Sequence, residues 1–378
     1  MRTMVAALLL ASACYSPHPQ AGAPCPDNVC PTGLVCSPVT HTCETTAQNP
    51  DGGGPDAPPD VAADANVDAN TSTFLHRRRV TIHNGSGQVM PAGMTVSVPF
   101  GVLATLVSAG KAKADFSDVR VIGDNVGERD RIIDPPGGVA PVMVSFSLGA
   151  PIAANATSTE YAIYYSYANA GAAPANGHNV FPVYDDFSGP ISTAWLKNDA
   201  PQVTGGMLVL RGGHTDAITT TASADNIPVV SAVELVAKVQ DTNSNPTTQP
   251  EGTFYYWFGY QHTGDFSASE PWVVWIARGK GGIGAEQKSP VGCEAGCEPA
   301  PGTQDTAFHY YVVARNPGET RFFRDGAVPI TITVQNTEDY SLMVRNYMAT
   351  SDLDVDWIRG RARVNPDPTV TTGPEENL

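Results

Sequence analysis

The chain has 378 residues and a formal net charge of −16 at pH 7, from 38 acidic and 22 basic side chains. An acidic surface disfavours nucleic acid and anionic membrane surfaces as partners. No run of eighteen apolar residues follows the N-terminal segment, so the sequence predicts no membrane-spanning helix.

Residues 1–13 have the composition of a secretory signal peptide. Arg2 supplies a positive charge, residues 4–10 form an apolar stretch too short to span a bilayer, and small residues lead to Cys14. Ordinary cleavage would leave Cys14 as a free N-terminal thiol. The segment also resembles the bacterial lipoprotein box, whose cysteine receives a diacylglycerol group, although Ala11 stands where that family usually has leucine. We expect lipidation of Cys14, which would attach the protein to a membrane through acyl chains only.

The cysteine count supports this expectation. There are seven cysteines, so lipidation of Cys14 leaves six for three disulfides in an oxidising compartment. The module 14–48 is too small to bury a core, and disulfides would stabilise it in place of one. A zinc site that uses these cysteines with His41 is the alternative. The cysteines expected to form disulfides are Cys25, Cys30, Cys36, Cys43, Cys293 and Cys297.

Residues 49–73 have the composition of a disordered linker. They contain no aromatic side chain, many prolines and glycines, and an aspartate at about every fourth position. Such a segment cannot offset the entropy of ordering, and its like charges keep it extended. It is either a stalk that holds the body away from a membrane or an inert connection.

From Phe74 onward, alternating apolar and polar residues predict short β-strands separated by turn residues. Only residues 102–113 have helical periodicity. The fold class expected is all-β, with two consecutive jelly-roll-like β-sandwich units over residues 74–183 and 184–363, followed by a polar tail, 364–378. The strand candidates are residues 79–82, 94–98, 119–122, 142–146, 161–167, 207–210, 229–239, 254–260, 272–277, 308–315, 320–324, 330–334, 340–344 and 355–363.

The first unit resembles a known bacterial family. Residues 76–82 (HRRRVTI), residues 108–111 (SAGK) leading into 118–120 (DVR), and residues 160–165 (EYAIYY) are similar to segments of the bacterial domain of unknown function 2341. The resemblance covers about residues 74–183. The family has no assigned activity, so the resemblance implies a fold and no chemistry.

The second unit resembles the concanavalin A-like and laminin-G-like jelly rolls. Residues 184–189 (YDDFSG) with Trp195 look like the entry strand of that fold, and residues 355–359 (VDWIR) look like its last strand. Between them, residues 308–313 (FHYYVV) and 320–326 (TRFFRDG) look like its central hairpin. The resemblance implies a two-sheet sandwich.

Asp352, Asp354 and Asp356 alternate along a predicted strand, which would place them on one face. Jelly-roll glycosidases use paired carboxylates on a strand face, but a glutamate acid is missing from this series. Closely spaced carboxylates are also the ligands that calcium prefers. Because first and last strands are usually neighbours in this fold, Asp186 could join Asp354 or Asp356. The carboxylates are either solvated charges at the end of a strand or ligands of a structural calcium held by Asp186, Asp354 and Asp356, and we assign no catalytic residue or other cofactor.

Aromatic residues concentrate on two neighbouring predicted strands. Alternation places Tyr255 and Trp257 on one face of the strand 254–260, with Tyr256, Phe258 and Tyr260 on the other. One face fills the core, and the other is either core as well or an exposed platform on which sugar rings stack. The candidate ligand-binding residues are Tyr255, Trp257, Trp272 and Trp275.

Together these features predict a non-enzymatic, extracytoplasmic lipoprotein, lipid-anchored to the cell envelope at the outer membrane or cell surface. Its β-sandwich would bind a glycan or a surface protein. The alternative is a secreted polysaccharide-active enzyme, or an accessory subunit of one.

Overall fold

The computed structural model forms two compact units, residues 1–58 and 59–378, and each is described by itself. The residues that it describes are 35–36, 43–44, 73–135, 137–193, 195–198, 201–211, 214–219, 228–239, 255–261, 272–278, 282–289, 292–293, 306–333, 339–347 and 352–378.

Only two short strands of the first unit are described. Strand β1 (Val35–Cys36) pairs antiparallel with β2 (Cys43–Glu44), and Cys36 is the register partner of Cys43. The signal peptide, Cys14, Cys25, Cys30 and Cys297 lie outside the described residues, as does the linker up to residue 72. The predicted lipid and disulfides therefore remain predictions.

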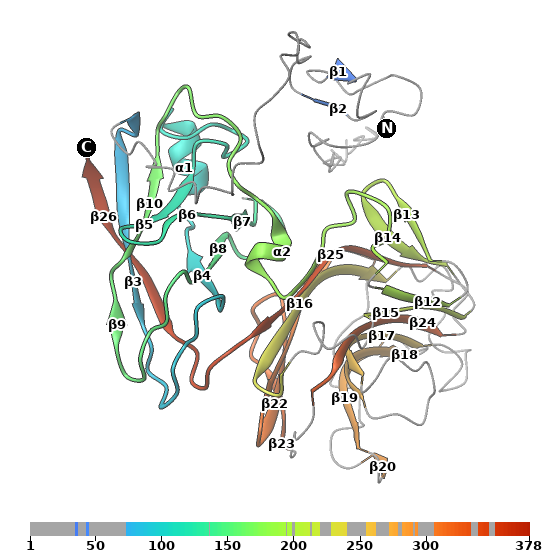
Figure 1. Cartoon of the computed structure of the whole chain (residues 1–378). Coiled ribbons are helices and arrows are strands. Elements are labelled where there is room, and N and C mark those ends of the chain that lie inside the picture. The colour runs from blue at the N-terminus through green and yellow to red at the C-terminus, as the bar shows by residue number, and fades with distance from the viewer. Residues whose placement is uncertain are drawn as a thin grey trace, which may run out of the picture. The chain divides into compact units, whose positions relative to one another are not determined.

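The second unit begins with a lobe built on two sheets around one core. In Figure 1 this lobe carries both the blue strand β3 and the red strand β26. Its core contains apolar side chains from alternate positions of its strands, such as Val80 and Ile82, as the predicted period of two requires. The six-stranded sheet has the order β26 (Thr369–Asn377), β3 (His76–His83), β10 (Tyr161–Tyr165), β5 (Arg120–Gly123) and β6 (Gly127–Arg129), with β9 (Thr157–Ser158) also paired to β3. The three-stranded sheet has the order β4 (Thr95–Pro99), β8 (Met143–Ser147) and β7 (Arg131–Ile133).

Two short helices accompany these sheets. The predicted helix is present as α1 (Leu103–Ser108), which is shorter than the periodic stretch and buries Leu103 and Leu106. The second helix, α2 (Gly177–Val180), starts at Asn176, whose side chain accepts a hydrogen bond from the amide of His178. Neither helix of the described residues has the length and apolarity needed to cross a bilayer.

The C-terminal residues form a strand and not the expected polar tail. Strand β26 pairs antiparallel with β3 along Thr369–Asn377, so the chain returns to the first lobe after it has formed the second. Its β-branched threonines suit a pleated strand. Glu375 and Glu376 are the register partners of Arg78 and Arg77, and opposite charges at facing positions stabilise a strand pair. The basic run on β3 therefore lies inside the sheet.

Truncation of the chain after Arg363 is expected to destabilise the first lobe. The deletion removes β26, the buried side chain of Val364, and the Glu375 carboxylate that accepts hydrogen bonds from Tyr165 (2.8 Å) and Lys111 (2.5 Å). Loss of Val364 burial alone costs about 1.5–3 kcal/mol of unfolding free energy. Thermal unfolding and protease sensitivity measure the effect, with deletion of the exposed Leu378 alone as the control. If both truncated proteins were equally stable, the claim that β26 stabilises the first lobe would be contradicted.

The second lobe is a β-sandwich, which confirms the predicted fold class. Large apolar side chains from both sheets fill the space between them, including Phe258, Leu235 and Phe322. The eight-stranded sheet has the order β13 (Gln202–Thr204), β14 (Met207–Leu210), β25 (Leu353–Ala362), β16 (Ser231–Val239), β21 (His309–Asn316), β22 (Glu319–Arg324) and β23 (Ile330–Thr333), with β11 (Val183–Asp185) also paired to β25. The seven-stranded sheet has the order β12 (Trp195–Asn198), β15 (His214–Thr219), β24 (Ser341–Tyr347), β17 (Tyr255–Gln261), β18 (Trp272–Arg278), β19 (Gly282–Ser289) and β20 (Gly292–Cys293).

A buried ionic network joins the two lobes of the second unit. Arg359 of β25 is 2% exposed and donates to both oxygens of Asp134 in the first lobe, at 2.9 and 3.0 Å. It also donates to Glu234 at 2.8 Å, and Arg361 donates to the other oxygen of Glu234 at 2.9 Å. Burial raises the pKa of Asp134. Burial also opposes ionisation of Glu234, but its two guanidinium neighbours outweigh this and lower the pKa of Glu234 to about 2.

Candidate functional site

The predicted aromatic residues divide between the two faces of the seven-stranded sheet. Tyr256, Phe258 and Tyr260 fill the inter-sheet core, as alternation predicts. Trp257 and Trp272 meet on the opposite, outer face, where their rings stack with centroids 4.8 Å apart and an interplanar angle of 29°. Each is 7% exposed. The pair is therefore packed within a small apolar cluster and is not an open platform.

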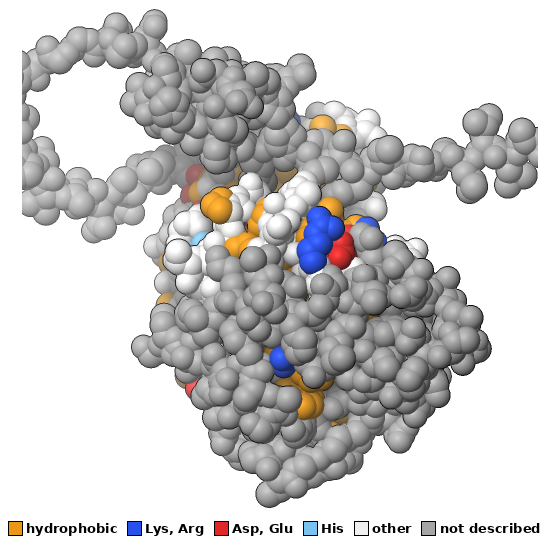
Figure 2. All heavy atoms as spheres, turned by 90° about the vertical axis from the view of Figure 1, so that its right-hand side faces the viewer, with side chains coloured by type: hydrophobic (Ala, Val, Ile, Leu, Met, Phe, Trp, Pro, Cys, Tyr) orange, Lys and Arg blue, Asp and Glu red, His pale blue; other side chains and the backbone are white. Residues whose placement is uncertain are grey.

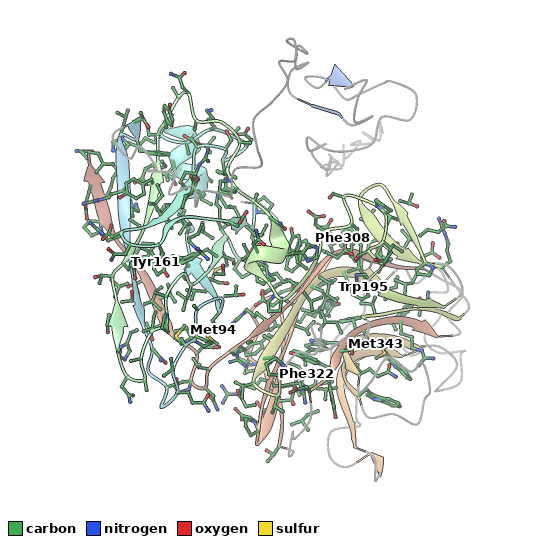
Figure 3. The ribbon with its side chains drawn as sticks, viewed as in Figure 1. Met94, Tyr161, Trp195, Phe308, Phe322 and Met343 are labelled. Atoms are coloured by element: carbon green, nitrogen blue, oxygen red, sulfur yellow. The ribbon has the colours of Figure 1, made fainter. Side chains whose placement is uncertain are left out.

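Trp275 lies on the other side of the sheet from this pair. Its Nε1 donates to the carbonyl of Val312 at 3.2 Å, and its ring meets Tyr311 and Phe322 edge-on in the inter-sheet core. Figure 3 labels Phe322 and Trp195, which belong to that core, and Met343, which belongs to the outer cluster of Trp257. For Tyr255 only the strand position is described, so the structure brings together two of the four predicted residues.

The predicted calcium ligands are not gathered into one site. Asp352 pairs with Arg211 at 2.7 Å, and Asp354 pairs with Lys238 at 3.0 Å. Among the described residues there is no group of three metal-ligating side chains able to hold an ion. Asp356 and Asp186 are the two predicted residues that remain near one another.

A β-bulge in the eight-stranded sheet sets the position of Asp356. The register between β16 and β25 shifts between Val236, which pairs with Trp357, and Ala237, which pairs with Val355. Val355 and Ile358 both face the inter-sheet core, so the two residues between them both lie toward the outer face. Leu353 also faces the core, so Asp354 and Asp356 share the outer face as the alternation predicts, and the bulge turns Trp357 onto that face as well.

Asp356 has an environment that favours its protonated form. Partial burial, and then the nearby carboxylate of Asp186, raise the pKa of Asp356 from its ordinary 3.8 to about 6. Asp186 comes directly after β11, which pairs with β25. It accepts hydrogen bonds from the Tyr184 hydroxyl at 3.4 Å and the Ser188 amide at 3.1 Å. Two neighbouring carboxyl groups with different surroundings are suited to opposite proton-transfer roles.

Half-buried aromatic rings lie on the same outer face of the eight-stranded sheet. Trp357 and Tyr310 meet with ring centroids 6.0 Å apart, and the Lys238 ammonium lies 4.9 Å from the ring of Phe308. Figure 3 labels Phe308, which directly precedes β21. We call Asp186, Asp356, Trp357 and Tyr310 the acidic-aromatic face. Sequence reasoning missed Trp357 and Tyr310 as binding candidates, because the bulge that turns Trp357 outward has no signal in the residue pattern.

The side-chain types visible from the sandwich side are mixed. Figure 2 shows hydrophobic, basic and acidic side chains interspersed over the coloured part of that view. The described surface in this view therefore carries no broad patch of one charge.

Comparisons with known proteins concern mainly the fold. No family model and no curated protein matches the chain, so the resemblance to the domain of unknown function 2341 stays a prediction. Several solved structures are similar. An endo-acting O-glycanase structure from human gut microbiota members that initiate mucin breakdown has 15% identity and a TM-score of 0.36, covering 48% of this chain and 98% of its own. A β-1,3-glucanase from Mycobacterium marinum has 13% identity and a TM-score of 0.34, covering 48% and 98%. The carbohydrate recognition domain of Emp47p has 8% identity and a TM-score of 0.37, covering 48% and 95%.

These likenesses correct one expectation. Glycanase, glucanase and glycosyl hydrolase structures stand among the neighbours, beside a carbohydrate recognition domain, so the prediction of a non-enzymatic protein is wrong and is withdrawn. That prediction rested on the lack of a catalytic sequence motif. Asp186 and Asp356 are 170 positions apart in the chain, and only the pairing of β11 with β25 brings them together.

Proposed function

We propose that this chain is a secreted polysaccharide-active enzyme, held at the cell envelope by a lipid on Cys14, that cleaves glycosidic bonds at the acidic-aromatic face. The observation that carries the proposal is the raised pKa of Asp356, about 6, beside the second carboxylate of Asp186. Glycosidases use such a pair, one carboxylic acid to protonate the leaving oxygen and one carboxylate on the other side of the reaction.

In this proposal Asp356 is the general acid. Its proton passes to the glycosidic oxygen as the bond from the sugar carbon to that oxygen breaks. The carboxylate of Asp186 stabilises the positive charge that develops on the sugar ring. Water then adds to the sugar carbon and gives a proton to the Asp356 carboxylate, which restores the acid. The hydroxyl of Tyr184 and the amide of Ser188, both hydrogen-bonded to Asp186, hold that carboxylate in place.

The aromatic rings of this face provide a surface for binding the glycan. Trp357 and Tyr310 have half-buried rings, and the Arg359 guanidinium lies over the Trp357 ring, 4.4 Å from its centroid. The apolar face of a sugar ring stacks on the aromatic surface that stays exposed. Trp257 and Trp272 are more deeply covered, so we place the glycan on the eight-stranded sheet. The Lys238–Asp354 pair borders the same face without adding net charge, which suits a neutral polymer.

The direct test is a screen of the purified full-length protein for release of reducing ends from a panel of neutral and acidic polysaccharides. We expect cleavage of at least one of them. On that substrate Trp357→Ala should raise KM about tenfold through the lost stacking surface. Trp272→Phe, a conservative change in the other sheet, is the matched control and should leave KM unchanged. Failure to cleave any polysaccharide in the panel would reject the proposed function.

A further inference from the structure

A groove of about 420 Å³ lies on the first lobe and is lined only by residues of that lobe. Its walls are the turn between β5 and β6, with Asp124 and Asn125, and the segment 151–160 that includes β9. All of its lining residues are described. Nothing in the proposed cleavage reaction uses this groove.

A buried amide fixes one wall of the groove before any ligand arrives. Asn84 is fully buried, and its Nδ2 donates to the carbonyls of Gln88 at 2.7 Å, Ala153 at 3.0 Å and Ile152 at 3.3 Å. Met90 and Ile152 also exchange backbone hydrogen bonds of 2.9 Å in both directions. The backbone of this wall is therefore held in one conformation, which lowers the entropic cost of binding.

The opposite wall is fixed by charge and backbone contacts. Arg79 donates to Oδ2 of Asp124 at 2.7 Å, which neutralises that carboxylate and orients it. The amide of Asp124 donates to the carbonyl of Glu160 at 3.0 Å, which ties the two walls together. Within the described structure, the carboxylate of Glu160 makes no hydrogen bond or ion pair, so it is free to accept from a ligand.

The lining has the chemistry of a site for hydroxyl groups. Carboxylate, amide and hydroxyl side chains of Glu160, Asn125, Thr157 and Thr159 line it, and apolar residues such as Ile152 form the rest. Carboxylates and amides pair with neighbouring hydroxyls of a sugar, and an apolar surface suits its C–H face. No lysine or arginine is among the lining residues, which disfavours phosphate and other anions. We propose that this groove binds a neutral oligosaccharide, as a non-catalytic site that holds polymer on the protein.

Affinity electrophoresis of the full-length protein tests the proposal. The gels contain one neutral polysaccharide each: a β-glucan, a mannan, a xylan or a galactan. We expect retardation in at least one gel. Thr159→Arg would fill the groove with a long side chain, and Glu160→Gln would remove the free carboxylate. Each variant should raise the apparent Kd for the polysaccharide at least tenfold. Thr331→Arg, at an exposed threonine of β23 in the other lobe, is the matched control and should not change it.

The outcomes separate this site from the cleavage site. Retardation that depends on Glu160 supports the groove as a binding site even if no polysaccharide is cleaved. The Asp356→Asn variant should be retarded as much as the parent protein. Absence of retardation in every gel, or retardation that Thr159→Arg and Glu160→Gln leave unchanged, overturns the proposal. Calorimetry with inorganic phosphate and with calcium chloride provides the other arms. Glu160-dependent binding of either ion, without retardation by polysaccharide, also overturns it.

Discussion

Replacement of Asp356 by asparagine is expected to reduce the rate of polysaccharide cleavage by about 10²–10⁴-fold, because an amide cannot donate the proton that the leaving oxygen needs. The asparagine has the same shape, and Asp356 has no ion pair among the described residues, so the fold should persist. Asp352→Asn is the matched control, since Asp352 pairs with the exposed side chain of Arg211. Its removal should cost less than about 1 kcal/mol of stability and leave kcat unchanged.

The pH dependence follows from the same carboxyl group. The acid form of Asp356 is lost as pH rises through about 6, so cleavage should decline above that pH. Between pH 4 and 6 the folded protein holds a proton that the unfolded chain has released, so stability also falls as pH rises through this window. Asp356→Asn removes this penalty and should stabilise the protein at pH 7 by about 1–2 kcal/mol, after allowance for the solvent-exposed part of the group.

Loss of activity together with a gain in thermal stability is the result expected of a catalytic carboxyl group whose pKa is raised at a cost in stability. Thermal unfolding at pH 4, 5.5 and 7, with initial rates at the same pH values, measures both effects. An Asp356→Asn variant that is as active as the parent protein, or no more stable at pH 7, would contradict the assignment of Asp356 as the acid.

The strands of this protein follow from local sequence, because alternation is a local property. The predicted strand at residues 207–210 matches β14, and the two predicted aromatic strands match β17 and β18 closely. The faces of Tyr256 and Phe258 follow from the same alternation. A local residue pattern does not predict which distant segments pair with one another. The return of β26 to β3 joins the two ends of the second unit, and no periodicity within either strand indicates its partner. The pairing of β11 with β25 is expected only from the resemblance to the jelly-roll fold.

The bulge in β25 shows the same limit at the candidate site. A period of two places Asp354 and Asp356 on the outer face, as observed, but it would turn Trp357 into the core, and one register shift turns that ring outward instead. The sequence therefore predicted the strand and the approach of Asp186 to Asp356, but not that Asp354 pairs with Lys238. An aromatic ring whose face depends on a bulge has no linear motif.

The largest expected effect on stability is that of Arg359→Met. This change removes the charge that Asp134 and Glu234 both contact and leaves two carboxyl groups buried at the junction of the lobes. Breaking one partner of a buried ionic network costs about 3–5 kcal/mol of unfolding free energy. Arg321→Met is the control, since the Arg321 side chain is 49% exposed and pairs with Glu319 at 2.7 Å, and its loss should cost less than about 1 kcal/mol.

Acid should reproduce part of this effect in the parent protein. The pKa of Glu234 is lowered to about 2 in the folded state, so its contribution is complete above its ordinary value of 4.5 and is lost as pH falls from there toward 2. In Arg359→Met this acid-sensitive contribution should shrink, because the guanidinium chiefly responsible for the low pKa is gone. Denaturant unfolding of both proteins at pH 3 and pH 6 measures the difference. Arg359 would prove dispensable to the junction if Arg359→Met and Arg321→Met unfolded at the same denaturant concentration, because a buried charge that holds two carboxylates must cost more to remove than one whose side chain is largely exposed.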